Sequence, residues 1–135
     1  PSRVDDGLLA VLAESELARV IVIHANHPAE LDSDVAAAVR RLAGLPAVVL
    51  NQAVLLRGVN DSAAVLRRLS ERLIEIGVVP YYLHLLDRVR GAAHFDVAEA
   101  EAVAIHAELR KTLPGYAVPR LVREIPGEPS KTPVV

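Results

Sequence analysis

The stretch VVPYYLHLL, residues 78–86, indicates how this chain folds. It is rich in Val, Leu and Tyr, and its apolar positions do not alternate with polar ones. Three further apolar runs share this character, at residues 18–23, 47–50 and 116–122. Continuous apolar strands are typical of a parallel sheet whose two faces are both buried. The sequence therefore predicts four buried strands covered by helices.

Amphipathic segments separate these runs, at residues 5–17, 32–43, 61–76 and 97–113. Each carries apolar residues at helical spacing, and two of them stop at a glycine. The resulting order, α-β-α-β-α-β-α-β, predicts an α/β fold built from right-handed βαβ units, with four parallel strands and helices outside. A closed eight-stranded barrel needs about 250 residues. We therefore expect either a small open sheet or the C-terminal half of a partial (βα) TIM-like barrel, with the first strand at an unpaired edge.

The composition of the chain argues against several classes of function. The chain has 135 residues, 52% of them apolar, a formal net charge of −2 and no cysteine. It therefore has no disulfide, thiol nucleophile or thiolate ligand of its own. No basic block indicates a nucleic-acid partner, and no apolar run or leader pattern indicates a membrane, so we predict a cytoplasmic protein. The chain opens with Pro1 inside a helical pattern, which suggests a piece of a longer protein.

The stretch REIPGEPSKTP, residues 123–133, follows the last predicted strand. Its three prolines and Gly127 forbid a regular continuation, so we expect a stiff loop that carries Lys131 back over the end of the strand. An amine held there suits a carbonyl cofactor, which forms a Schiff base with lysine. The alternative is a disordered tail with a solvated lysine.

Hydrogen-bonding or ionisable side chains follow all four predicted strands. In parallel α/β sheets, ligands bind at the carboxyl ends of the strands, so four such groups together predict one ligand site. In chain order the side chains are His24, Asn26, His27 and Glu30; Asn51, Gln52, Arg57, Asn60 and Asp61; His84, Asp87, Arg88 and His94; and Glu124 with Lys131.

Most of these residues also have a purely structural interpretation. His27 and Pro28 form a turn that caps the next helix in this view, and Asn60 with Asp61 caps the helix that follows. His84 becomes a hydrogen-bonded core histidine. Arg57 becomes a surface residue, and Asp87 with Arg88 an exposed ion pair of little energetic worth.

A metal-dependent barrel hydrolase is a further alternative, with ligands His24, His27, His84 and Asp87. Against it, no element carries a His-x-His or Glu-x-x-His pair, and Lys131 has no role there. A Ser-His-Asp hydrolase lacks its nucleophile-elbow motif, and no Gly-rich phosphate loop is present.

Five ordered motifs resemble the lysine 2,3-aminomutase family of radical S-adenosylmethionine enzymes, which also use pyridoxal phosphate. The resemblance covers nearly all of this chain and matches only the C-terminal part of the family's catalytic chain. The variants HLLD (84–87) and GEPSK (127–131) most resemble the branch that makes (R)-β-lysine for elongation factor P. The motifs are HANHPAE (24–30), NQAVLLRGVND (51–61), PYYLHLLD (80–87), GAAHF (91–95) and GEPSKTP (127–133).

The resemblance implies a role for five residues. Lys131 matches the catalytic lysine that holds pyridoxal phosphate as a Schiff base. Asp87 and Glu124 match carboxylates that bind the distal amine of the substrate. His24 and Gln52 match residues that approach S-adenosylmethionine, and no residue is implied as a metal ligand.

The sequence departs from the family pattern at two places, and both bear on which branch of the family it resembles. Ala53 stands where the family usually has serine, and GEPS (127–130) replaces a Gly-rich approach to the lysine. The family's three cysteines, in a Cys-x-x-x-Cys-x-x-Cys motif, lie upstream of this region. The 4Fe-4S cluster is therefore expected outside this chain, and the chain alone is expected to be inactive.

The resemblance thus predicts the C-terminal portion of an isomerase that converts L-lysine, a small-molecule substrate. Residues 1–125 would form βα units of a radical S-adenosylmethionine partial barrel, and residues 126–135 the cofactor-lysine loop and tail. The alternative is a non-catalytic fragment or interaction module, which pairs with another copy through the open sheet edge to form a homo-oligomer.

Overall fold

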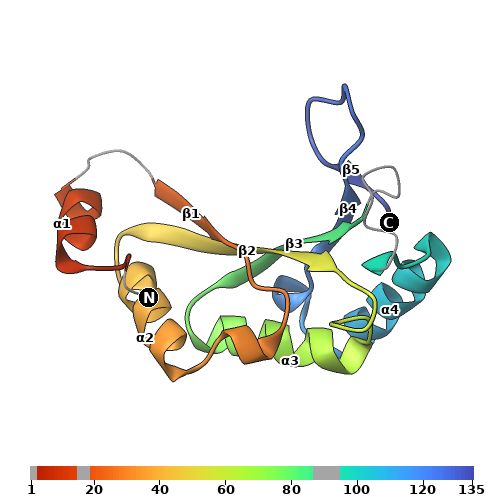
Figure 1. Ribbon diagram of the computed structural model, residues 1–135, viewed down its shortest axis with the longest axis horizontal. Helices are drawn as coiled ribbons and strands as arrows, with labels where there is room; N and C mark the ends of the chain where they lie inside the picture. The colour runs from red at the N-terminus through yellow and green to blue at the C-terminus, as the bar shows by residue number, and fades with distance from the viewer. Residues whose placement is uncertain (1–2, 15–18, 87–94) are drawn as a thin grey trace.

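The computed structural model describes residues 3–14, 19–86 and 95–135. It has an α/β fold with one five-stranded sheet, in the order β1-β2-β3-β4-β5 (Figure 1). The predicted α/β class is therefore confirmed, and among the described strands β1 lies at an edge of the sheet, as predicted. Sequential strand order is the arrangement that successive right-handed βαβ units produce.

Four of the strands are parallel, as predicted, and a fifth was not expected. The parallel strands are β1 (Arg19–Ile23), β2 (Ala47–Leu55), β3 (Val79–Leu85) and β4 (Arg120–Arg123). The two-residue strand β5 (Thr132–Pro133) pairs antiparallel to β4, so part of the predicted tail joins the sheet.

Two predicted strand boundaries are wrong. Strand β2 continues to Leu55, so Asn51 and Gln52 lie within it rather than after it. Gln52 lines the hollow on the open face, whereas Asn51 is buried and its amide is hydrogen-bonded to the backbone of Ala25. At the other boundary, Tyr116 is 69% exposed in the short helix η4 (Gly115–Ala117), and β4 begins only at Arg120.

The helices lie close to their predicted positions. They are α1 (Asp6–Glu14), α2 (Ser33–Ala43), α3 (Ala63–Glu75) and α4 (Glu99–Thr112). The Asp32 carboxylate caps α2 by accepting a 2.9 Å hydrogen bond from the backbone N–H of Val35. No helix within the described ranges has the length and apolar character needed to cross a membrane.

The start of α3 differs from the prediction. Ser62 is the N-cap, and its hydroxyl accepts from the backbone N–H of Val65 at 3.2 Å. Asn60 and Asp61 are not the caps. Asn60 is fully buried, and the Asp61 carboxylate instead accepts from the backbone N–H of Gly58 at 3.0 Å.

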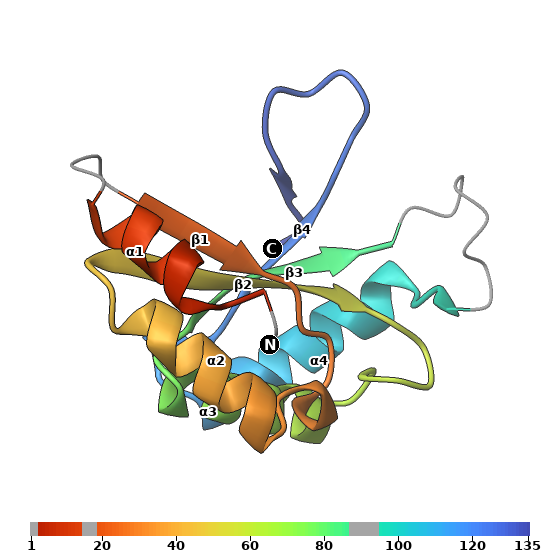
Figure 2. The same cartoon turned by 60° about the vertical axis from the view of Figure 1, so that its left-hand side comes forward.

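Helices α2, α3 and α4 all cover the same face of the sheet (Figures 1 and 2). The core lies between that face and the helices. Its fully buried leucines are Leu55, Leu66, Leu73, Leu83, Leu109 and Leu121. This one-sided packing brings successive βα units onto a common apolar layer.

The prediction that both faces are buried is wrong for the first two strands. Val20 and Val48, which are register partners, are 63% and 52% exposed on the face opposite the helices. Side chains alternate between the faces of a strand, so only every second residue of these runs reaches the core. Continuous apolar sequence alone does not identify which layer covers the second face.

Gly77 makes the tight turn from α3 into β3. Its φ of +86° lies in the left-handed region, and a Cβ built on it would lie 2.9 Å from the Cβ of Ala43. A side chain at Gly77 would therefore strain the backbone and also push α3 away from α2.

Substitution Gly77→Ala should lower the free energy of unfolding by about 2–3 kcal/mol, measured by denaturant unfolding. Gly58 is a matched control, because its φ is +77° but a Cβ there would meet nothing within 4 Å. Gly58→Ala should cost only the backbone strain of about 1–2 kcal/mol. Equal losses for the two variants would contradict the close contact inferred at Gly77.

Candidate functional site

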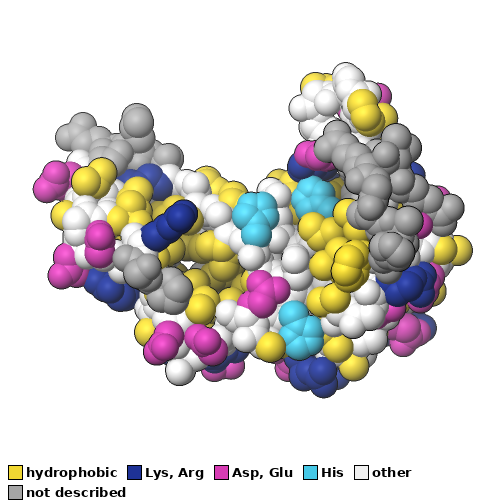
Figure 3. All heavy atoms as spheres, viewed as in Figure 1, with side chains coloured by type: hydrophobic (Ala, Val, Ile, Leu, Met, Phe, Trp, Pro, Cys, Tyr) yellow, Lys and Arg dark blue, Asp and Glu magenta, His cyan; other side chains and the backbone are white. Residues whose placement is uncertain are grey.

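A hollow of about 290 Å³ lies on the face of the sheet that the helices leave open, at the carboxyl ends of the parallel strands. Five polar or charged residues that the sequence singled out line it together, along with Val54, Leu85 and Leu86. Histidine side chains are visible near the hollowed middle of one face of the molecule (Figure 3). The five polar residues are His24, Gln52, His84, Glu124 and Lys131.

Strand register brings these side chains to one place. Gln52 pairs with Tyr82, and Val54 pairs with His84, so all four side chains face the same side of the sheet. His24 follows the last residue of β1 directly. His24, Gln52 and His84 thus line one hollow, although Gln52 and His84 lie within their strands and only His24 follows the end of one.

Lys131 reaches the hollow through the β4–β5 pairing. Val122 pairs with Pro133 and Arg123 with Thr132, so Glu124 and Lys131 occupy the next facing positions. The Lys131 Nζ donates to the Glu124 carboxylate, and the Lys131 side chain is only 24% exposed. The loop therefore returns the lysine to the end of the strand, as predicted.

His84 lies at the centre of this group on β3. Its Nε2 is 3.3 Å from Oε1 of Gln52, and the Tyr82 ring packs edge-on with a centroid separation of 5.7 Å. Burial is the main reason that the pKa of His84 lies below its ordinary value of 6.5. The Lys131 cation and His24 lower this pKa further, while Glu124 opposes them. A neutral imidazole is therefore favoured at neutral pH.

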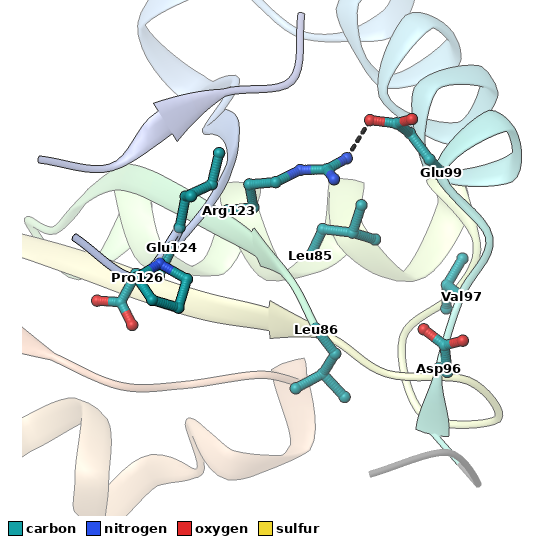
Figure 4. A pocket seen from close by; sticks show the side chains of 9 residues that line it. Leu85, Leu86, Asp96, Val97, Glu99, Arg123, Glu124 and Pro126 are labelled. Carbon is teal, nitrogen blue, oxygen red and sulfur yellow. Dashed lines mark hydrogen bonds and ion pairs between the residues drawn. The ribbon is translucent and has the colours of Figure 1, made fainter. Parts of the chain in front are cut away.

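A second hollow, of about 370 Å³, adjoins the first at Glu124 and extends towards the start of α4. Figure 4 shows Arg123 and Glu99 pointing towards each other across it, while Glu124 points away from that pair. Neighbouring residues of a strand face opposite sides, which explains the different directions of Arg123 and Glu124. Glu99 and Asp96 were not among the predicted site residues, although α4 begins with acidic residues.

Other predicted residues lie away from the first hollow. The His27 Nδ1 accepts from the backbone N–H of Ala29 at 3.0 Å and caps the short helix η1 (Pro28–Glu30), which confirms its structural interpretation. Arg57 pairs with Glu101 at 2.9 Å and donates its Nε–H to the carbonyl of Asp96 at 2.8 Å. This hydrogen-bonded pair raises the pKa of Arg57 and ties the β2–α3 loop to α4.

Asp87, Arg88 and His94 lie outside the described residues. The role of Asp87 therefore stays a prediction, although its neighbour Leu86 lines both hollows. Within residues 3–14, 19–86 and 95–135, no group of three or more His, Asp or Glu side chains is arranged to hold a metal ion. The described part of the chain thus offers no ligand set for the hydrolase alternative.

One buried histidine was not predicted from the sequence. His106 on α4 is 7% exposed, and its Nε2 lies 2.8 Å from the carbonyl oxygen of Pro119. It joins α4 to the segment that leads into β4. His106 follows the helical spacing of the buried residues Ala102 and Leu109, and this spacing could have predicted that it is buried.

Comparisons with known proteins found close relatives but no matching protein-family model. The chain is 48% identical to the L-lysine 2,3-aminomutase of Haemophilus influenzae over 98% of the chain, and 48% identical to that of Escherichia coli over 99%. It is 43% identical to that of Buchnera aphidicola over 97% of the chain. These alignments cover 39%, 39% and 38% of the relatives, so the chain spans about two fifths of their length.

The charges around His84 predict opposite effects of two substitutions on its pKa. Lys131→Gln removes a cation and should raise this pKa, although burial should keep it below 6.5. Glu124→Gln removes the opposing anion and should lower it. Histidine-resolved NMR titration measures both shifts, and shifts in the same direction would contradict the charge arrangement.

The same lowered pKa makes stability depend on pH. The unfolded chain binds a proton at His84 more readily than the folded chain does, so the stabilisation is complete above the ordinary pKa of 6.5 and is lost as the pH falls below it.

Proposed function

Because this chain belongs to the L-lysine 2,3-aminomutase family over almost all of its own length, we propose that it forms the C-terminal part of an isomerase that converts L-lysine into (R)-β-lysine. In this proposal the product serves the modification of elongation factor P. The observation that carries the proposal is the convergence of Lys131, Glu124, His84, Gln52 and His24 on one hollow at the strand ends.

Lys131 would hold pyridoxal phosphate through its amine. The fit is supported by the partial burial of that side chain and by its return to the strand end on a hairpin. When bound, this cofactor supplies an electron sink that stabilises a radical while the amino group migrates from C2 to C3. His24 and Gln52 would face S-adenosylmethionine from the neighbouring strands.

Glu124 would select a substrate with a long cationic side chain. Its carboxylate already accepts a hydrogen bond from the ammonium group of Lys131, which is chemically the same group as the distal amine of L-lysine. A hydrogen bond to a charged group is worth about 1.5–3 kcal/mol. The neutral state favoured at His84 avoids placing a second cation beside that amine. Asp87 would contribute the second carboxylate.

The 4Fe-4S cluster would be held by another part of the full-length protein. Such clusters are bound by cysteine thiolates, and this chain has no cysteine. The sequential strand order and the shared helix-covered face support a partial (βα) barrel, in which further βα units would continue the sheet beyond β1. Activity would then require the longer protein.

Substitution Lys131→Ala in the full-length protein should abolish the visible absorbance of lysine-bound pyridoxal phosphate, because the aldehyde loses its amine. Lys111, the other lysine of this chain, is a matched control. It pairs with Glu108 on the surface of α4, and its side chain is 71% exposed, so Lys111→Ala should leave the spectrum unchanged. An unaltered spectrum in Lys131→Ala would place the cofactor elsewhere.

One observation favours a second candidate, the non-catalytic interaction module. Among the described strands, β1 has a neighbour on one side only, and Val20 and Val22 expose 63% and 41% of their surface beside that edge. An exposed strand edge beside apolar side chains is a template for pairing with another chain. Here the partner would be a second copy.

This alternative predicts that the isolated chain is a dimer in light scattering and that Val20→Lys makes it a monomer, because a lysine at the edge opposes pairing. Val11→Lys is a control, since Val11 is 68% exposed and belongs to α1 rather than to a strand. A well-folded, strictly monomeric wild-type chain would count against the alternative.

A further inference from the structure

One buried side chain satisfies both backbone polar groups of Ala25, the residue directly after His24. The Asn51 Oδ1 accepts from the Ala25 N–H at 2.9 Å, and its Nδ2 donates to the Ala25 carbonyl at 3.1 Å. Asn51 and Ala25 are 2% and 3% exposed. Because both residues have so little access to water, the Asn51 amide takes the place of water as the hydrogen-bond partner of the Ala25 backbone.

We call the two hydrogen bonds between Asn51 and Ala25 a clamp, and two further asparagines extend it. The Asn26 Oδ1 accepts from the N–H of Val54 at 2.9 Å. The Asn60 Nδ2 donates to the carbonyls of Asn26 and Val54, at 2.7 and 2.9 Å. The ladder between β1 and β2 ends at Ile23 and Asn51, but β2 continues to Leu55. The asparagine amides therefore take over hydrogen bonds that a longer β1 would have made.

We propose that Asn51 is a positioning residue, which sets His24 in the hollow with Gln52, His84 and Lys131 by clamping Ala25. The inference rests on the proposed function, in which His24 faces S-adenosylmethionine. Asn51 and Gln52 are adjacent on β2, and their side chains lie on opposite faces of the sheet. Gln52 thus reaches the hollow directly, and Asn51 acts on it through the backbone beside His24.

The amide chemistry at Asn51 is specific. A leucine of similar branching would fill the same space in the apolar layer, but it would neither accept from nor donate to Ala25. Leaving two buried backbone groups unpaired is costly, so the segment that carries His24 would shift towards other partners. The hairpin that carries Lys131 pairs with β4 and makes none of these hydrogen bonds.

The pKa of His84 reports on the position of His24, since His24 is one of the groups that lower it. We would measure it by NMR in the full-length protein with 15N-labelled histidine, prepared without iron. His24→Ala and Asn51→Leu should each raise this pKa. The double variant should match His24→Ala alone, because a residue that acts through another has no effect once that residue is gone.

Ser70→Ala is the matched control, because Ser70 is a polar core residue on α3 that is also 2% exposed. It should leave the pKa of His84 unchanged. An unchanged pKa in Asn51→Leu, or a further shift in the double variant, would overturn the proposal. Should Asn51→Leu fail to fold, Asn26→Ala removes the bond to Val54 and must raise the pKa in the same way.

Binding of S-adenosylmethionine separates this inference from the proposed function. Equilibrium dialysis should show Kd raised roughly tenfold in both His24→Ala and Asn51→Leu, the worth of about one hydrogen bond, with Ser70→Ala unaffected. Absorbance of lysine-bound pyridoxal phosphate should persist in all three variants. An unchanged Kd together with the expected pKa shifts would support the positioning by Asn51 and refute the role of His24.

Discussion

The register of the parallel ladder from β1 to β4 is the constraint on which the site depends. It pairs Val54 with His84 and His84 with Val122. The side chains of these three partners therefore all lie on the face of the sheet that the helices leave open. Because side chains alternate, a slip of one residue in any strand would exchange a core leucine for a pocket residue. Burial of Leu55 and Leu83 on the helix side therefore also fixes Gln52 and His84 on the other side.

Two different devices complete the site where this ladder ends. Beyond β1, asparagine amides replace the missing strand partner and hold the segment after His24 against β2. Beyond β4, an antiparallel hairpin turns the chain back and sets Lys131 opposite Glu124. Both devices rely on hydrogen bonds, which pair backbone groups that the parallel ladder no longer reaches.

The open face has two regions with different chemistry. Towards the carboxyl ends of the strands it carries imidazole, amide, amine and carboxylate groups around a hollow. Towards the amino ends it carries exposed valines, among them Val20 and Val48. A polar site beside an exposed apolar surface is what a sheet would show if further protein covered that surface. The chain spans only about two fifths of the length of its curated relatives. In the proposed partial barrel, further protein would cover these valines.

The sequence by itself determined the α/β class, the parallel strands and the return of Lys131 to a strand end, since these follow from local apolar runs, helical spacing and prolines. It also brought out His24, Gln52, His84 and Glu124 as neighbours through family motifs and the rule that strand ends converge. Only the tertiary structure decided that β2 extends to Leu55, that Ser62 rather than Asn60 caps α3, and that one face of the sheet stays open. Those outcomes depend on which distant backbone groups an asparagine can reach and on which layer packs against each face, and neither is encoded in the neighbouring residues.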